Sequence, residues 1–190
     1  MSCEIANGRL EKCKDVVGGI DAIYFINYGD YNPVESPAGD VTYVTGTDTI
    51  QEIAGVTSLY KYELKGTNSF DQVYNSSREN GTTFAEQTLT VTLKKQDATT
   101  HKNVKLMAYG RPHIVVKNRN NQFFLAGLEH GMEITTANVS NGTAMGDLNG
   151  YTLTFVGTEK LYANLLDCSS EADLAGGAGD VFGSATIVTS

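Results

Sequence analysis

The chain has 190 residues and a formal net charge of −8, with 22 acidic and 14 basic residues. This length fits one domain with a hydrophobic core. The acidic balance argues against a nucleic-acid-binding surface, because such binding needs clustered cations that displace counterions from phosphates.

The sequence predicts no membrane insertion, because it contains no run of about 18 apolar residues. The first residues also lack an apolar run of signal-peptide length. We therefore expect the protein to be made in a cytoplasm and to stay soluble until it assembles.

The N-terminal third predicts an arm followed by strands. Residues 1–18 read as an extended N-terminal arm that ends at two glycines. Residues 20–28 are almost continuously apolar, which is typical of a strand buried on both faces. A loop over 29–40 contains two prolines, and short strands follow at about 41–45 and 48–53.

The three cysteines are expected to be free thiols, because an odd number in a reducing compartment does not form a disulfide framework. These are Cys3, Cys13 and Cys168. A disulfide between Cys3 and Cys13, or a metal site, is the less favoured alternative, since further Cys or His ligands at short spacing are lacking. The sequence predicts neither a metal nor a cofactor.

Residues 58–96 predict one long, protruding β-hairpin with Arg78–Gly81 at its tip, because two β-rich runs flank a turn that carries Asn-Gly. Arms of about 15 to 20 residues would reach roughly 50 to 65 Å, far beyond a usual strand. We expect the first arm to bend at 66–68, where Gly66 permits it. We also expect the hairpin to pair with neighbouring copies, because its edges are unpaired backbone templates.

The register of this hairpin follows from its apolar pattern, because a slip of one residue would place the apolar side chains on opposite faces. The predicted pairs are Ser77 with Thr82, Tyr74 with Ala85, Phe70 with Leu89 and Gly66 with Leu93.

The two faces of the predicted hairpin differ in chemistry. The apolar side chains that would anchor it on the domain are Phe70, Tyr74, Leu89 and Leu93. The opposite, hydroxyl-rich and mildly acidic face carries the candidate functional residues, which are Thr67, Ser69, Asp71, Asn75, Glu79, Glu86, Thr88, Thr90 and Thr92.

The middle of the chain predicts one short α-helix over about 97–109, with an Asp or Thr cap at its start and a stop at Gly110. Strands resume at 112–118, 122–128 and 132–139, and residues 151–157 alternate as a half-buried strand should. The fold class is therefore mainly β: an antiparallel β-sandwich or barrel over 19–166, with one short helix and the long hairpin.

Residues 167–190 predict a flexible C-terminal arm, because glycine and small residues dominate there. The β-branched run at 185–189 fits either strand addition to a neighbouring copy or a frayed tail, and the sequence leaves both open.

No catalytic constellation stands out, so we expect a protein that is not an enzyme. His101, His113 and His130 lack the spacing of a metal or catalytic motif. The glycine-rich stretch 176–183 is followed by no Lys-Ser/Thr pair, so it is interpreted as a linker. The ten tyrosines leave a carbohydrate-binding face as a minor alternative, although the chain has no tryptophan.

Three stretches, together with the order of elements, carry a resemblance to a known family. They are residues 13–20, CKDVVGGI; residues 111–116, RPHIVV; and residues 143–155, TAMGDLNGYTLTF. Over most of residues 10–165 the chain resembles the tail tube proteins of tailed bacteriophages. That family shares its fold with the inner-tube proteins of contractile injection systems.

The resemblance implies a mechanism without covalent chemistry. Six copies would form a ring, their hairpins would close into an inner barrel, and stacked rings would form the conduit through which DNA passes. The polar face of the hairpin would line a hydrated, negative lumen that keeps DNA from sticking. Loops 29–40 and 140–150 and both termini would contact the next ring.

The same resemblance implies partners and a location. The partners would be further copies of the chain and other tail proteins, namely the terminator, the baseplate and, in a contractile tail, the sheath. The protein would reside in the virion tail after assembly in the cytoplasm of the bacterial host.

Two other classes stay open. A different phage structural component, such as a tail terminator, a baseplate hub or a capsid decoration protein, would share this composition without polymerising. A carbohydrate-binding β-sandwich would be monomeric and would bind glycans through exposed tyrosines. Helical self-assembly distinguishes the tail tube from both.

Overall fold

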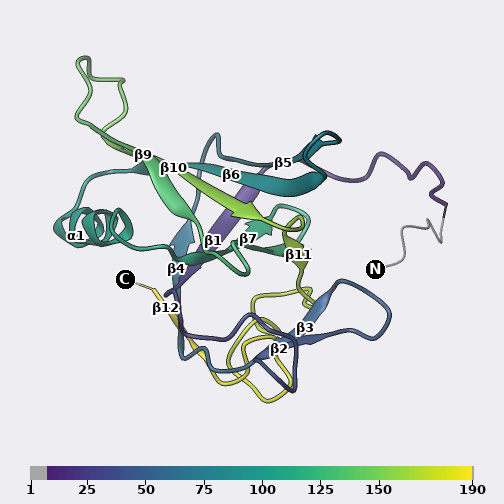
Figure 1. Cartoon of the computed structure of the whole chain (residues 1–190). Coiled ribbons are helices and arrows are strands. Elements are labelled where there is room, and N and C mark those ends of the chain that lie inside the picture. The colour runs from purple at the N-terminus through teal and green to yellow at the C-terminus, as the bar shows by residue number, and fades with distance from the viewer. Residues whose placement is uncertain (1–7, 190) are drawn as a thin grey trace.

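The computed structural model of the chain describes residues 8–189 as a mainly β fold with antiparallel sheets and one helix, which confirms the predicted fold class (Figure 1). The elements are β1 Ile20–Ile26, β2 Val41–Tyr43, β3 Ile50–Ile53, β4 Ser58–Glu63, β5 Ser69–Ser77, β6 Thr82–Lys94, α1 Ala98–Met107, β7 His113–Asn118, β8 Phe123–Ala126, β9 Glu133–Ser140, β10 Gly150–Glu159, β11 Asn164–Leu165 and β12 Thr186–Val188.

A six-stranded sheet in the order β11-β8-β7-β1-β4-β12 forms the middle of the molecule. Its strand β1 is buried on both faces, as the apolar run predicts. Tyr24 and Ile26 pack into one core with β2, β3 and the C-terminal segment, whereas Ile23 and Phe25 pack into a second core on the other face. The sheet therefore separates two hydrophobic cores.

A four-stranded sheet in the order β5-β6-β10-β9 covers the second core. Its inward side chains include Leu89 of β6 and Tyr151, Leu153 and Phe155 of β10, all fully buried. Figure 1 shows this sheet lying across the six-stranded sheet, with α1 at one side of the pair. The two sheets make the predicted sandwich.

The predicted hairpin is shorter than expected. Its register is correct, because Ser77 faces Thr82, Tyr74 faces Ala85 and Phe70 faces Leu89. However, β4 belongs to the six-stranded sheet, so only residues 69–94 form the hairpin.

The chain changes sheets at Gly66, whose φ of +114° suits glycine and confirms the predicted bend. Gly66 therefore does not pair with Leu93 inside the hairpin. The hairpin also does not stand off the domain as a free arm, because β6 pairs with β10 from Ala85 to Lys94. The reason is that Leu89 and Val91 of β6 bury their side chains in the second core beside Leu153 and Phe155 of β10.

Helix α1 starts and ends close to the predicted positions. The side chain of Asp97 accepts a hydrogen bond from the backbone N–H of Thr100 at 2.8 Å, which caps the first turn. Val104 is buried in the second core. This helix has ten residues, and no helix of the described part of the chain is long and apolar enough to cross a membrane.

The C-terminal segment differs most from its prediction, because residues 167–189 are not a free arm. Leu174, Val181 and Phe182 are buried in the first core, between β2, β3 and the six-stranded sheet. Strand β12 then pairs in parallel with β4 of its own chain. The prediction of a flexible arm considered only the glycines and small residues of this segment. It did not take account of the apolar residues between them, which enter the core.

The N-terminal residues 8–18 form neither helix nor strand, and all of them are exposed. The backbone of Val17 exchanges two hydrogen bonds with the side chain of Asn120, at 3.0 and 2.8 Å. Cys13 and Cys168 are both free thiols. Cys3 lies outside the described residues, so its expected state stays a prediction.

Replacing Phe182 by Ala should lower the free energy of unfolding by about 3 to 5 kcal/mol, because a fully packed aromatic ring would leave a cavity. Chemical denaturation monitored by circular dichroism measures this loss. Met145→Ala is the matched control, since Met145 is fully exposed and should change stability little. Equal, small effects of both changes would restore the flexible-arm interpretation.

Candidate functional site: the outer face of the four-stranded sheet

The polar face predicted for the hairpin lies on the outer surface of the four-stranded sheet. Residues that pair directly across neighbouring strands share a face, so the register assigns this surface across all four strands. We call it the hydroxyl face. It consists of Ser69, Asp71, Val73 and Asn75 of β5; Thr82, Phe84, Glu86, Thr88, Thr90 and Thr92 of β6; Thr152, Thr154, Val156 and Thr158 of β10; and Glu133, Thr136 and Asn138 of β9.

Hydroxyl side chains form rows across this face. One row runs over all four strands, through Ser69, Thr90, Thr154 and Thr136. Thr88, Thr90 and Thr92 in the centre are partly buried by their neighbours, and the β5 residues at the edge are exposed. Hydroxyl groups are thus available to water along most rows, and Val73, Phe84 and Val156 are the apolar members of the face.

The charge of the hydroxyl face is negative. Asp71, Glu86 and Glu133 point outward from three different strands. The register places Lys94 on the same face at the end of β6, opposite Gly150, and Arg78 lies at the hairpin tip. A phosphate that approached the middle of this face would meet carboxylates and no paired cation.

Most predicted polar residues lie on this face, and two do not. Thr67 precedes β5, and Glu79 lies in the hairpin tip; both are exposed outside the sheet. Conversely, sequence reasoning missed the contributions of β10 and β9, such as Thr154 and Thr136. The alternation of residues 151–157 indicated a polar side for β10, but only the sheet order joins that side to the hairpin.

Three of the four predicted anchoring residues point inward. Leu89 is fully buried, and Phe70 and Leu93 pack against the second core. Tyr74 does not: it is 39% exposed, and its ring centroid lies 3.9 Å from that of Tyr162. The hydroxyl of Tyr74 accepts a hydrogen bond from the backbone N–H of Tyr162 at 3.3 Å. Tyr74 therefore holds the connection after β10, not the core.

A buried glutamine ties the two sheets together, and the sequence analysis missed it. Gln87 is 1% exposed; its side-chain oxygen accepts from the backbone N–H of Gly127 at 2.9 Å, and its side-chain nitrogen donates to the carbonyl of Leu161 at 3.3 Å. Gln72 adds a 2.6 Å bond from the backbone N–H of Ala163. Gln87 interrupts the apolar alternation of Ala85 and Leu89, which is the pattern that could have revealed it.

The strands β5 and β9 are the two edges of this sheet, and within residues 8–189 no strand pairs with their outer sides. Edge strands are usually blunted by lysine, proline or a cover. The nine residues of β5 and the eight of β9 contain neither lysine nor proline. β5 thus presents a regular edge with which another strand could pair, whereas the edge of β9 is interrupted by a bulge between Ile134 and Thr136.

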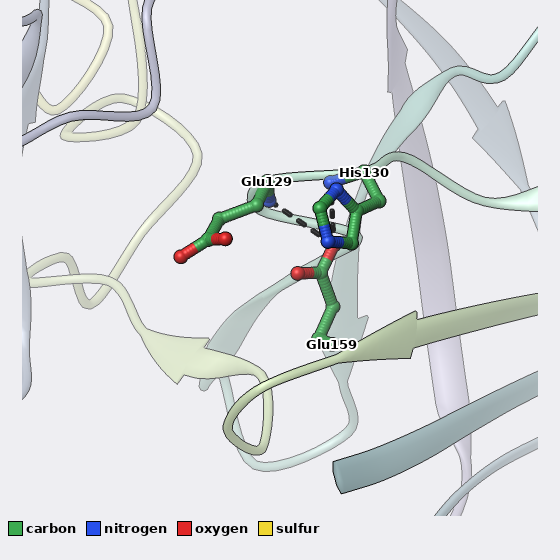
Figure 2. A group of neighbouring side chains, drawn as sticks. All are labelled: Glu129, His130 and Glu159. Atoms are coloured by element: carbon green, nitrogen blue, oxygen red, sulfur yellow. Dashed lines mark hydrogen bonds between the residues drawn. The ribbon is translucent and has the colours of Figure 1, made fainter.

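A second cluster of polar side chains lies at the end of β10 (Figure 2). One ligand atom each of Glu129, His130 and Glu159 lies within 4.8 Å of the others. Glu159 is 5% exposed, and its carboxylate accepts from the backbone N–H groups of Glu129 and His130, at 3.1 and 2.8 Å. Glu129 forms an ion pair with Lys160 at 2.8 Å. The carboxylates thus have partners within the chain, and the cluster braces the loop between β8 and β9.

Burial raises the pKa of Glu159, and the hydrogen bond from His130 opposes that rise. The side chain of His130 is exposed, whereas its backbone N–H donates to Glu159.

Comparison with protein families, curated proteins and solved structures finds no match for this chain. The likeness to tail tube proteins therefore rests on the three sequence stretches and the order of elements alone.

Replacing Glu159 by Gln should change the pH dependence of stability. The folded state holds the Glu159 proton more tightly than the unfolded chain, so this contribution to stability is present below the unfolded pKa and is lost as pH rises through the folded pKa. Glu159→Gln keeps an acceptor oxygen and has no proton to lose. Relative to the wild type, it should gain stability as pH rises above about 4.3, as urea unfolding at a series of pH values would show.

Glu159→Ala is the matched comparison. It leaves the two backbone N–H groups without their acceptor and should cost about 1 to 3 kcal/mol at every pH. A loss for Glu159→Gln as large as that for Ala would mean that the brace needs the carboxylate charge.

Proposed function

We propose that this chain is a structural subunit that closes laterally into rings and serves as the tail tube protein of a bacteriophage. The observation that carries the proposal is a four-stranded sheet whose polar face continues across all four strands and whose two edge strands pair with no further strand within residues 8–189. Assembly, not catalysis, is the activity that these features suit.

The edges support ring closure. If β5 of one copy pairs with β9 of the next, each copy uses two different surfaces, and such a heterologous contact closes into a ring when the rotation permits. The closed ring continues the sheet without an end, which removes the exposed edges. Rings of six follow the family that the sequence resembles.

The chemistry of the sheet supports the orientation of the subunit. Its apolar face is already covered by the six-stranded sheet and α1, through Leu89, Phe155 and Val104. The hydroxyl face is therefore free to line the inside of the ring. There its carboxylates would repel the phosphates of passing DNA, and its hydroxyls would keep a layer of water on the wall.

The proposal includes other tail proteins as partners and the virion tail as the location. A terminator, baseplate or decoration protein would need no polymerisation, and a carbohydrate-binding sandwich would need no paired edges. Two edge strands without lysine or proline, β5 and β9, favour the self-assembling subunit over both.

Lysines on the β5 edge should abolish assembly. Ser69→Lys with Val73→Lys places two charges on the edge strand, where lysine discourages strand pairing. The matched control is Thr154→Lys with Thr158→Lys, because these residues occupy the same cross-strand rows on the central strand β10. Negative-stain electron microscopy and light scattering should show rings or tubes for the wild type and the control, and monomers for the edge variant.

If both variants fail to assemble, the loss of assembly is caused by positive charge on the hydroxyl face and not by a blocked β5 edge. A wild-type protein that stays monomeric at high concentration, with and without added preformed rings of other tail proteins, would contradict the proposed function.

Reversing the charge of the hydroxyl face should make the protein bind DNA. The change is Asp71→Lys, Glu86→Lys and Glu133→Lys, which places cations where phosphates would pass. Fluorescence anisotropy with a short labelled duplex should detect no binding to the wild type and salt-sensitive binding to the variant. A control with Glu35→Lys, Asp48→Lys and Glu52→Lys makes the same change in net charge around β2 and β3, away from this face. It should bind more weakly; equal binding would mean that net charge alone decides.

A further inference from the structure

A groove of about 670 Å³ lies between α1 and the β4 side of the six-stranded sheet. Its walls are mostly apolar and aromatic, from Phe25, Tyr28, Tyr62, Leu106 and Met107, and Arg111 stands among them. None of the described residues that line the groove is acidic, in a chain whose net charge is −8. Such a size and lining suit a binding site.

The groove contains a free strand edge. Strand β12 pairs with β4 only from Ser58 to Tyr60, and among the described strands none continues along Lys61–Glu63. A helix beside an open strand edge is the arrangement into which an extended peptide adds as a further strand. The groove therefore favours an extended segment over a compact ligand.

Arg111 selects the charge of that segment. Its guanidinium lies 4.5 Å from the ring centroid of Tyr28, which orients it, and it forms no salt bridge within residues 8–189. A guanidinium held in this way favours a carboxylate, which it can bind through two parallel hydrogen bonds.

The chain itself carries a segment of matching chemistry. In residues 8–18, Leu10, Val16 and Val17 are 89%, 72% and 59% exposed. Asp15 directly precedes the two valines. Within the described residues the segment is held by hydrogen bonds near its end, at Val17 and Gly18. The segment lies outside helices and strands, is apolar at the two valines and carries a carboxylate directly before them.

The arm and the groove lie at opposite ends of β1. The arm leaves next to Ile20, which pairs with Asn118, and the groove lies at Phe25 and Tyr28. Figure 1 shows the N-terminal trace leaving on the side away from α1. The separation along β1 is about 20 Å at roughly 3.3 Å per residue. An arm directed away from its own groove is placed to reach the groove of another copy.

We propose that residues 8–18 of one copy dock as an added strand in the α1–β4 groove of the next copy. Asp15 pairs with Arg111, the valines pack on the apolar wall near Leu106 and Met107, and the arm backbone pairs with β4 beyond Tyr60. The contact is head-to-tail, so it propagates into a stack. The inference rests on the proposed function, to which it adds the groove that receives the arm and the residues that pair there.

Two complementary variants test the contact. The arm variant, Val16→Asp with Val17→Asp, keeps an intact groove. The groove variant, Leu106→Asp with Arg111→Glu, keeps an intact arm, and its changed residues are exposed enough to leave the fold intact. Tyr109→Asp is the control, because Tyr109 is 93% exposed just after α1 and does not line the groove.

Each variant alone should fail to stack, and the control should stack like the wild type. Mixed one to one, the two variants should form pairs that grow no further, because only one arm and one groove of each pair are functional. Size-exclusion chromatography with light scattering measures this. Pairs of rings support both proposals, and pairs of single chains support the arm contact while contradicting ring closure. Long tubes from either variant alone overturn the arm contact and leave ring closure standing.

A peptide tests the contact without any assembly. The labelled peptide of residues 8–18, with Cys13→Ser, should bind the arm variant saturably in fluorescence anisotropy. Arg111→Ala introduced into that protein should weaken binding about tenfold. A peptide with Asp15→Lys should bind poorly to it and should recover affinity for a protein with Arg111→Glu. Absence of saturable binding, or indifference to these charge reversals, overturns the proposal.

Discussion

The pairing of β6 with β10 is the constraint on which the rest of the structure depends. It runs without a break from Gly150 opposite Lys94 to Glu159 opposite Ala85. On one side of this ladder Leu89 faces Phe155 inside the second core, and on the other side Thr90 faces Thr154. A shift of one residue would exchange these sides and place hydroxyls in the core. The register of this one ladder thus determines three features: where the core lies, which surface is polar, and which strands are the edges of the sheet.

Local patterns were sufficient where the partner lies nearby in the chain. The alternation around Phe70, Tyr74 and Leu89 predicted the hairpin register, and Asp97 predicted the start of α1. Gly66 predicted a bend but not its result, because the sheet that β4 joins depends on β1. The continuously apolar sequence of β1 indicated burial on both faces, which is what separates the two cores. The part of the hydroxyl face on β5 and β6 could therefore be predicted from the sequence. The part on β10 and β9 could not, because these strands join the face through long-range pairing.

Long-range contacts explain the parts that could not be predicted. Leu174 and Phe182 lie among glycines, and their burial depends on β2 and β3, which precede them by more than a hundred residues. Tyr74 appears apolar in the alternation, yet its hydroxyl accepts a hydrogen bond from the backbone N–H of Tyr162, in the connection after β10. Gln87 is polar in an apolar row because Gly127 and Leu161 satisfy its amide. In each case the groups around the side chain belong to an element far away in the sequence, so the local sequence pattern could not predict them.

Two proposed contacts of the assembly use separate parts of the chain, and this separation has a physical consequence. The lateral contact uses the edges of the four-stranded sheet, whereas the arm and its groove lie at opposite ends of β1 in the other sheet. Copies that each carry a charge of −8 repel one another, so a single weak contact between two chains is short-lived. Once a ring is closed, it presents several arms to several grooves together, and the second and later arms bind at a high effective concentration. The contacts between arms and grooves thus become long-lived only after the ring has closed. We therefore expect stacking to follow ring closure.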